Sequence, residues 1–149
     1  MRAPSSSLQA QMEVSLPFEV ALTMQGKVPR VISIIPLLPS ISTEKFFIQL
    51  LHSLALSAEE IEALSAQYQP HCSIFVPAPR FKTNLVVNIV PSLDLYASLD
   101  VALVSDAVLL LMSSTDEVQL EGEAILRSLQ GQAGNVTVMP CVQVSCQIS

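Results

Sequence analysis

Glycine is scarce in this 149-residue chain, and its scarcity bears on phosphate binding. The four glycines are Gly26, Gly122, Gly131 and Gly134, so none lies between Lys27 and Glu121. Loops that cradle phosphates use glycine because its backbone reaches angles and close approaches that other residues disfavour. The sequence therefore argues against a phosphate-binding loop, and against the D-x-x-G turn of a GTPase, anywhere in that interval.

Metal-binding and nucleophilic residues are also few. Cys72, Cys141 and Cys146 form no C-x-x-C pair, and His52 and His71 offer no ligand cluster, so we expect no structural zinc site and no disulfide framework. Residues His71 and Cys72 are adjacent, and adjacent strand residues point to opposite faces, which disfavours a catalytic dyad. We expect free or buried thiols.

Positive charge is missing from the second half of the chain. Up to Lys82 six acids balance six bases, but from Thr83 onward seven acids face Arg127 alone, and the net charge is −6. Such a segment repels a phosphate backbone. Any contact with nucleic acid should therefore come from the first half. The chain also has neither an N-terminal secretory pattern nor an apolar run long enough to span a bilayer, so we expect no membrane partner.

What the chain does have is an alternation of strand-like and helical patterns. "RVISIIPLL" is a β-branched run typical of a strand buried on both faces. Two further strands, "HCSIFVPAP" and "RFKTNLVVNIV", are predicted to form a hairpin, the second of them near the sheet edge. Ala107 to Met112 predicts a central strand, and "NVTVM" a later one. Strands that alternate with helices predict a three-layer α/β domain with a mostly parallel sheet.

Four helices are expected between these strands. The first begins at about Thr43, the second at a capping box of Ser57 and Glu60, and the third runs from Asp94 to about Ser105. A fourth should begin at a capping box of Ser114 and Glu117, with its buried face traced by a further set of residues. That set is Val118, Gly122, Ile125, Leu126 and Leu129.

Nucleotide-binding chemistry is absent where a P-loop fold would carry it. The first strand is followed by "PLLPSISTEKFF", in which prolines stand where glycines are needed, and Lys45 already lies within a helix. No N-K-x-D motif follows the last strand. Asp94 and Asp106 have structural interpretations: the first starts a helix, and the second is expected to bond backbone amides. Asp94, Asp100 and Asp106 do not share one helical face.

Three segments carry a resemblance to a known family. "PRVISIIPLLPSIS", "RFKTNLVVNIVPSLDLYASLDVALVSDAVLLLMSST" and "EGEAILRSLQGQ" resemble the first domain of the TSR-type ribosome-maturation factors, the family of the twenty-S rRNA accumulation protein. Pro29 to Leu37, Asp94 to Ser113 and Gly122 to Gly131 match the family pattern. The D-L-Y-x-x-L-D helix followed by V-x-D-x-V-L-L-L is the specific part, and BMS-type ribosome-biogenesis GTPases are relatives.

The resemblance implies a translational-GTPase-like, P-loop-type fold without a functional P-loop. It implies a non-enzymatic ribosome-biogenesis module with no cofactor and no metal. The module would bind small-subunit pre-ribosomes, both rRNA and ribosomal proteins, and support small-subunit rRNA maturation in the nucleolus and nucleus, with possible association in the cytoplasm. A GTP-binding assembly GTPase of the BMS type, active or degenerate, is the alternative, and a fragment without a stable fold is a third.

The chain departs from the family in its ends and in its basic residues. We expect a loosely ordered lead-in at 1–27, a GTPase-like domain at 28–140 that is truncated at its C-terminal end, and a tail at 141–149. We expect the family's long basic N-terminal extension to be absent, because Arg2, Lys27 and Arg30 are the basic residues among the first 30. The candidate rRNA or protein contacts are Lys27, Arg30, Arg80 and Lys82, each of which is otherwise an ordinary solvated surface charge.

Overall fold

Five strands form one sheet in the order β2-β3-β1-β4-β5. The computed structural model describes residues 28–132 and 136–143. The strands are β1 (Arg30–Pro36), β2 (Ser73–Ala78), β3 (Thr83–Ile89), β4 (Ala107–Ser113) and β5 (Thr137–Gln143). The helices are α3 (Thr43–Ser53), α4 (Ala58–Ala66), α5 (Leu95–Leu103) and α6 (Leu120–Gln132), and a 3-10 turn, η1 (Pro79–Phe81), joins β2 to β3.

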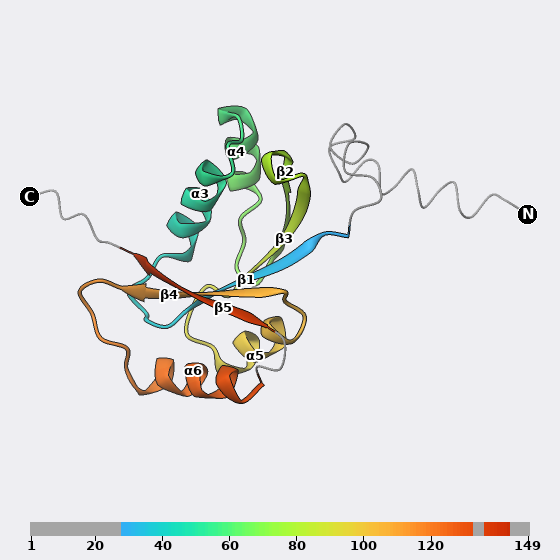
Figure 1. The fold of residues 1–149 in the computed structure, drawn as a ribbon. Helices are drawn as coiled ribbons and strands as arrows, with labels where there is room; N and C mark the ends of the chain where they lie inside the picture. Colours follow the sequence, from blue (N-terminus) through green and yellow to red (C-terminus); the bar gives the residue numbers. More distant parts are fainter. Residues whose placement is uncertain (1–27, 133–135, 144–149) are drawn as a thin grey trace, which may run out of the picture.

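The sheet is mostly parallel, as the sequence predicts. β1 pairs in parallel with both β3 and β4, and β4 pairs in parallel with β5. β2 alone is antiparallel, because the short η1 turn folds it back onto β3 as a hairpin. Helices α3 and α4 cover one face of the sheet, and α5 and α6 cover the other (Figure 1). This arrangement confirms the three-layer α/β fold class.

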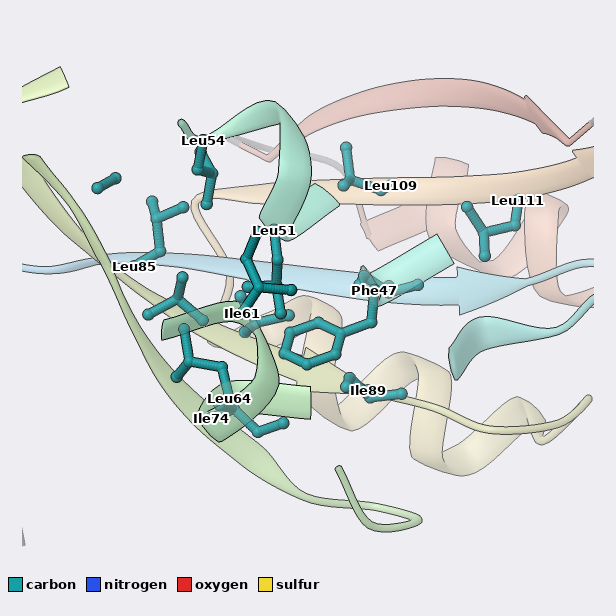
Figure 2. Packing of buried hydrophobic residues seen from close by; sticks show 14 of the residues in the cluster. Phe47, Leu51, Leu54, Ile61, Leu64, Ile74, Leu85, Ile89, Leu109 and Leu111 are labelled. Atoms are coloured by element: carbon teal, nitrogen blue, oxygen red, sulfur yellow. The ribbon is translucent and has the colours of Figure 1, made fainter. Parts of the chain in front are cut away.

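Each face of the sheet has its own apolar core. On the α3–α4 side, Phe47 and Leu51 are fully buried and pack with Ile61, Leu64 and strand residues such as Ile89 (Figure 2). On the other side, a second cluster joins the sheet to α5 and α6. Its buried members are Ile35, Leu37, Val90, Ala102, Val108, Leu110, Ile125 and Leu129. Strand β1 contributes residues to both clusters, since alternate residues of a strand face opposite sides.

The helix starts follow local side-chain chemistry. Ser57 and Glu60 form the predicted capping box, with the Glu60 amide bonded to the Ser57 hydroxyl and the Ser57 amide bonded to the Glu60 carboxylate. Asp94 caps α5 by accepting a hydrogen bond from the Ala97 amide at 3.0 Å. Ser42 caps α3 in the same way. These three starts needed only residues close in sequence, which is why the sequence predicted them to within a residue or two.

The prediction that the second hairpin strand lies near the sheet edge is confirmed, although β3 is not the edge strand itself. β3 lies between β2 and β1, and β2 takes the edge. The partial alternation of polar residues in β3 comes from Asn84 and Asn88, which are buried rather than solvated. The Asn88 amide is satisfied internally, since its carbonyl oxygen accepts from the Ser73 hydroxyl at 2.5 Å and its NH2 group donates to Ser33 at 3.5 Å. Buried polar residues such as these give a strand the same alternation of polar and apolar residues as solvent-exposed ones do.

The predicted capping box at Ser114 and Glu117 is wrong, because α6 begins at Leu120. The Ser113 hydroxyl instead accepts hydrogen bonds from the amides of Thr115 and Asp116 in a turn after β4. Val118 therefore precedes the helix and packs against both apolar clusters, where it closes the end of the sheet. Gly122, Ile125 and Leu129 do form the buried face of α6.

The other boundaries can be compared only in part. The predicted lead-in, 1–27, lies outside the described residues. β5 continues to Gln143, past the predicted domain boundary at 140. Within residues 28–132 and 136–143, no helix has the length and apolar character that crossing a membrane requires.

Candidate functional site

The carboxyl ends of the parallel strands meet at one edge of the sheet, where open α/β sheets bind their ligands. In Figure 1 this edge is on the left, where β1 and β4 end. It consists of the loops after β1, β3 and β4 (residues 37–42, 90–94 and 114–119) together with the first turns of the helices that follow. A GTPase-like domain would hold its nucleotide here, so this is the first place to look for chemistry.

Six carboxylates occupy this edge. They are Glu44, Asp94, Asp116, Glu117, Glu121 and Glu123. In residues 37–46, 90–98 and 114–123, which make up this edge, Lys45 is the one lysine or arginine. We call this region the acidic edge. An electrostatic field of this sign disfavours a phosphate and favours a cationic group.

The loop after β1 is filled by its own side chains. Leu37, Leu38 and Ile41 are almost fully buried, Leu37 in the core beneath α5 and α6 and the other two in the core beneath α3 and α4. A phosphate-binding loop must instead curl around an open space with its amides pointing inward. Here the Leu37 amide donates to the Leu111 carbonyl at 3.0 Å, the Ile41 amide donates to the Leu38 carbonyl, and Pro39 has no amide hydrogen.

Helix N-termini are the other anion-binding groups of such an edge, and those of α3 and α5 are capped by side chains of the chain itself. The Ser42 hydroxyl accepts from the Lys45 amide at the start of α3, and the Asp94 carboxylate accepts from the Ala97 amide at the start of α5. Free amides at these positions would bind a phosphate, but a capping side chain already satisfies one of them at each helix. The sequence interpretation of Asp94 as a helix-start residue is confirmed.

The first turn of α6 closes the remaining space against the end of β1. A Cβ built at Gly122 would lie 2.3 Å from the Leu37 carbonyl oxygen and 2.7 Å from Cγ1 of Val118. Nearby, the Ser40 hydroxyl donates to the Asp116 carboxylate at 3.0 Å and ties the loop after β1 to the loop after β4. Beside this contact lies a shallow depression of about 540 Å³ lined by Val118, Gln119, Leu120, Glu121 and Glu123, a set without a cation.

The predicted contact residues gather at the opposite edge. Arg30 is the first residue of β1, and Arg80 and Lys82 belong to the η1 turn. Because Arg30 is in register with Leu85, three residues beyond Lys82, the turn projects past the start of β1 by roughly 10 Å. We call Arg30, Arg80, Phe81 and Lys82 the basic edge. Lys27 lies outside the described residues, so its position relative to the other three is not described.

Asp106 anchors the basic edge. Its carboxylate accepts a hydrogen bond from the Val31 amide at 2.8 Å and lies 3.9 Å from the Arg30 guanidinium. The expectation that Asp106 bonds a backbone amide is thus confirmed. Both side chains of the ion pair are well exposed, so the pair contributes little stability and leaves Arg30 accessible to solvent.

Sequence reasoning missed Phe81. Its ring is 59% exposed, and the Arg80 guanidinium carbon lies 5.7 Å from the ring centroid, a cation–π contact. The signal was present in the sequence as an aromatic residue between two bases, Arg80-Phe81-Lys82, at the tip of a predicted hairpin.

The cysteines and the metal-ligating residues are the remaining candidates for chemistry. Cys72 and Cys141 are free thiols, and partial burial raises the pKa of the Cys141 thiol, which keeps it protonated and unreactive near neutral pH. In the described part of the chain, no three His, Cys, Asp or Glu side chains are placed to hold a metal ion.

Two comparisons with known proteins agree with the geometry. A family model described as "Tsr1, G-like domain" matches residues 30–149. The chain is also 30% identical over 136 residues to the "Ribosome biogenesis protein tsr1" of Schizosaccharomyces pombe (strain 972 / ATCC 24843). That alignment covers 88% of this chain and 17% of the relative, so the chain spans a small part of that protein's length. The resemblance in the sequence is confirmed, and the chain belongs to the Tsr1 G-like domain family.

Proposed function

We propose that this chain is a non-catalytic GTPase-like module of a ribosome-biogenesis factor. It binds small-subunit pre-ribosomes, contacts their rRNA and ribosomal proteins, and supports small-subunit rRNA maturation without binding or hydrolysing GTP. Its place of action is the nucleolus and nucleus, with association continuing on cytoplasmic pre-ribosomes. The printed function of the fission-yeast relative supports the ribosomal assignment.

The filled acidic edge is the observation that carries the non-catalytic part of the proposal. A bound GTP would need amides, a lysine and a magnesium ligand around its phosphates. At this edge it would meet buried leucine and isoleucine side chains, capped helix starts and six carboxylates. The chain keeps the fold of a G-like domain without an open nucleotide site, and a pre-ribosome would bind the surface of that fold rather than a nucleotide-dependent conformation.

The alternative is a GTP-binding assembly GTPase of the BMS type. Its support is Lys45, which lies in the first turn of α3 and is the one lysine or arginine in residues 37–46, 90–98 and 114–123. Lys45 is exposed and its amide is bonded to the Ser42 hydroxyl, so the helix has already begun at this residue. The proposed function and this alternative therefore differ in a single measurable property, the affinity for GTP.

The proposal is tested by sedimentation of the tagged chain from cell extracts. We expect it to co-sediment with small-subunit precursors, and we expect depletion to cause unprocessed small-subunit rRNA to accumulate. Addition of a non-hydrolysable GTP analogue should leave the sedimentation unchanged. Recovery of the chain only in light fractions, with rRNA processing intact after depletion, would overturn the proposal.

A further inference from the structure

The η1 turn presents an aromatic ring and cations at one exposed point of the molecule. Phe81 is 59% exposed although it is a large apolar residue, and the Arg80 guanidinium lies over its ring at 5.7 Å. An aromatic ring flanked by bases is the pattern by which proteins stack nucleobases and hold the adjoining phosphates.

The turn is held rigidly by its backbone. Proline at 79 restricts the start of the turn, and the Lys82 amide donates to the Pro79 carbonyl at 3.0 Å. Below it, β2 and β3 pair from Ala78 and Thr83 onward. A ring presented on a fixed hairpin loses little conformational entropy when a ligand stacks on it, so its exposed face is ready for binding.

Cations are concentrated at this edge. In residues 28–132 and 136–143 the lysines and arginines are Arg30, Lys45, Arg80, Lys82 and Arg127, and three of these five belong to the basic edge. Two acids at the same end have contacts of their own: Asp106 bonds the Val31 amide and pairs with Arg30, and Glu60 caps α4. Glu59 lies beside Glu60 in the first turn of α4. The basic edge is therefore suited to a polyanion although the chain as a whole is acidic.

From this juxtaposition we infer that the basic edge is a binding site for single-stranded RNA. An unpaired base stacks on Phe81, and the flanking phosphates contact Arg80, Lys82 and Arg30. Single-stranded rather than duplex RNA is the partner, because bases inside a helix are stacked on each other and offer no free face to a protruding ring. The inference rests on the proposed function, since pre-ribosomes supply the RNA.

Binding of a fluorescent 12-nucleotide oligouridine to the full 149-residue chain tests the stacking contact. Phe81→Leu keeps an apolar side chain but removes the π-face, and we expect it to weaken binding at least about fivefold. Phe81→Trp should retain or strengthen binding. The matched control is Tyr96→Leu, which removes an aromatic ring of 79% exposure from α5 and should leave binding unchanged.

The salt dependence of the same binding tests the phosphate contacts. Three cations on a single strand predict that log Kd rises with log salt concentration with a slope of about 2, and each contact contributes roughly 0.7. Arg80→Gln should lower that slope by about 0.7. Arg127→Gln makes the same change of charge on α6, where Arg127 pairs with Glu123, and should leave the slope unaltered.

Several results would overturn the inference. They are no binding of oligouridine, equal binding of Phe81→Leu and the unmodified chain with matching melting curves, or equal affinity for a blunt RNA duplex. Failure of this test leaves sedimentation with pre-ribosomes intact, because that can proceed through protein contacts. Conversely, RNA binding by a chain that stays in light fractions would support the inference and contradict the proposed function.

Discussion

In residues 28–132 and 136–143, three residues other than glycine adopt left-handed backbone angles, which we attribute to the scarcity of glycine. Ala55, His71 and Lys82 have φ values of 57°, 55° and 52°. Each lies at a junction: Ala55 after α3, His71 before β2 and Lys82 after η1. Glycine is the usual residue at such positions, because a Cβ there clashes with the backbone. The interval without glycine therefore carries local strain at its turns.

Ala55→Gly should stabilise the protein. Ala55 follows Leu54, the C-cap of α3, in the position where helices most often carry glycine, so removal of its Cβ should raise the free energy of unfolding by about 1 kcal/mol. The same substitution at Ala63, an exposed residue within α4, should lower it by about 1 kcal/mol. Chemical denaturation measures both variants, and equal signs would contradict the strain at Ala55.

Among the elements, α6 and the strand edges determine how the sheet is closed. The approach of α6 to the end of β1 depends on Gly122, because a side chain there would meet both the Leu37 carbonyl oxygen and Val118.

The two outer strands of the sheet each carry a proline. The hydrogen-bond pattern of the sheet leaves Pro77 of β2 and Pro140 of β5 at positions whose amides would point away from the sheet. Proline has no amide hydrogen, so a strand added at either edge would lack a hydrogen bond there.

Gly122→Ala tests the closure of the acidic edge. The new methyl group would stand 2.3 Å from the Leu37 carbonyl oxygen, and we expect a loss of stability of about 1–3 kcal/mol as α6 shifts outward. Gly131→Ala, in the same helix, meets nothing within 4 Å and should stabilise by up to about 1 kcal/mol. Thermal melts of the two variants decide the point. If Gly122→Ala left the melting temperature unchanged, α6 would not pack against the loop after β1.

At the scale of the whole molecule, charge is separated along the direction of the strands. Where the parallel strands end, six carboxylates accompany Lys45 alone, whereas Arg30, Arg80 and Lys82 lie where the strands begin, together with Asp106, Glu59 and Glu60. This polarity is the reverse of what a nucleotide-binding sheet needs, since phosphates bind at the carboxyl ends of strands. It directs the acidic edge toward cationic partners and the basic edge toward polyanions.

The sequence predicted the parts of the fold that depend on neighbouring residues. The strand runs, the Ser57–Glu60 capping box and the roles of Asp94 and Asp106 follow from local patterns, and all are confirmed. The sequence predicted β3 near the sheet edge from its polar alternation, but that alternation comes from Asn84 and Asn88, which are buried rather than solvated. The delayed start of α6 was missed because Val118 is held by both cores rather than by a helix.

The candidate site divides in the same way. The scarcity of glycine could be read from the sequence. The burial of Leu37, Leu38 and Ile41 in the two cores could not be predicted from it. The bases of the basic edge were predicted individually. Their convergence with Phe81 depends on the β1–β3 register, a long-range property of the sheet.

The central claim, that this G-like domain works without nucleotide, is tested most directly by its melting temperature in GTP and magnesium. If GTP bound with a Kd of about 10 μM, about 1 mM nucleotide would stabilise the fold by roughly 2.7 kcal/mol, a rise of roughly 5–10 °C for a domain of this size. We predict no change in melting temperature, for the unmodified chain and for Lys45→Gln alike. A rise of several degrees that Lys45→Gln abolishes would contradict the claim.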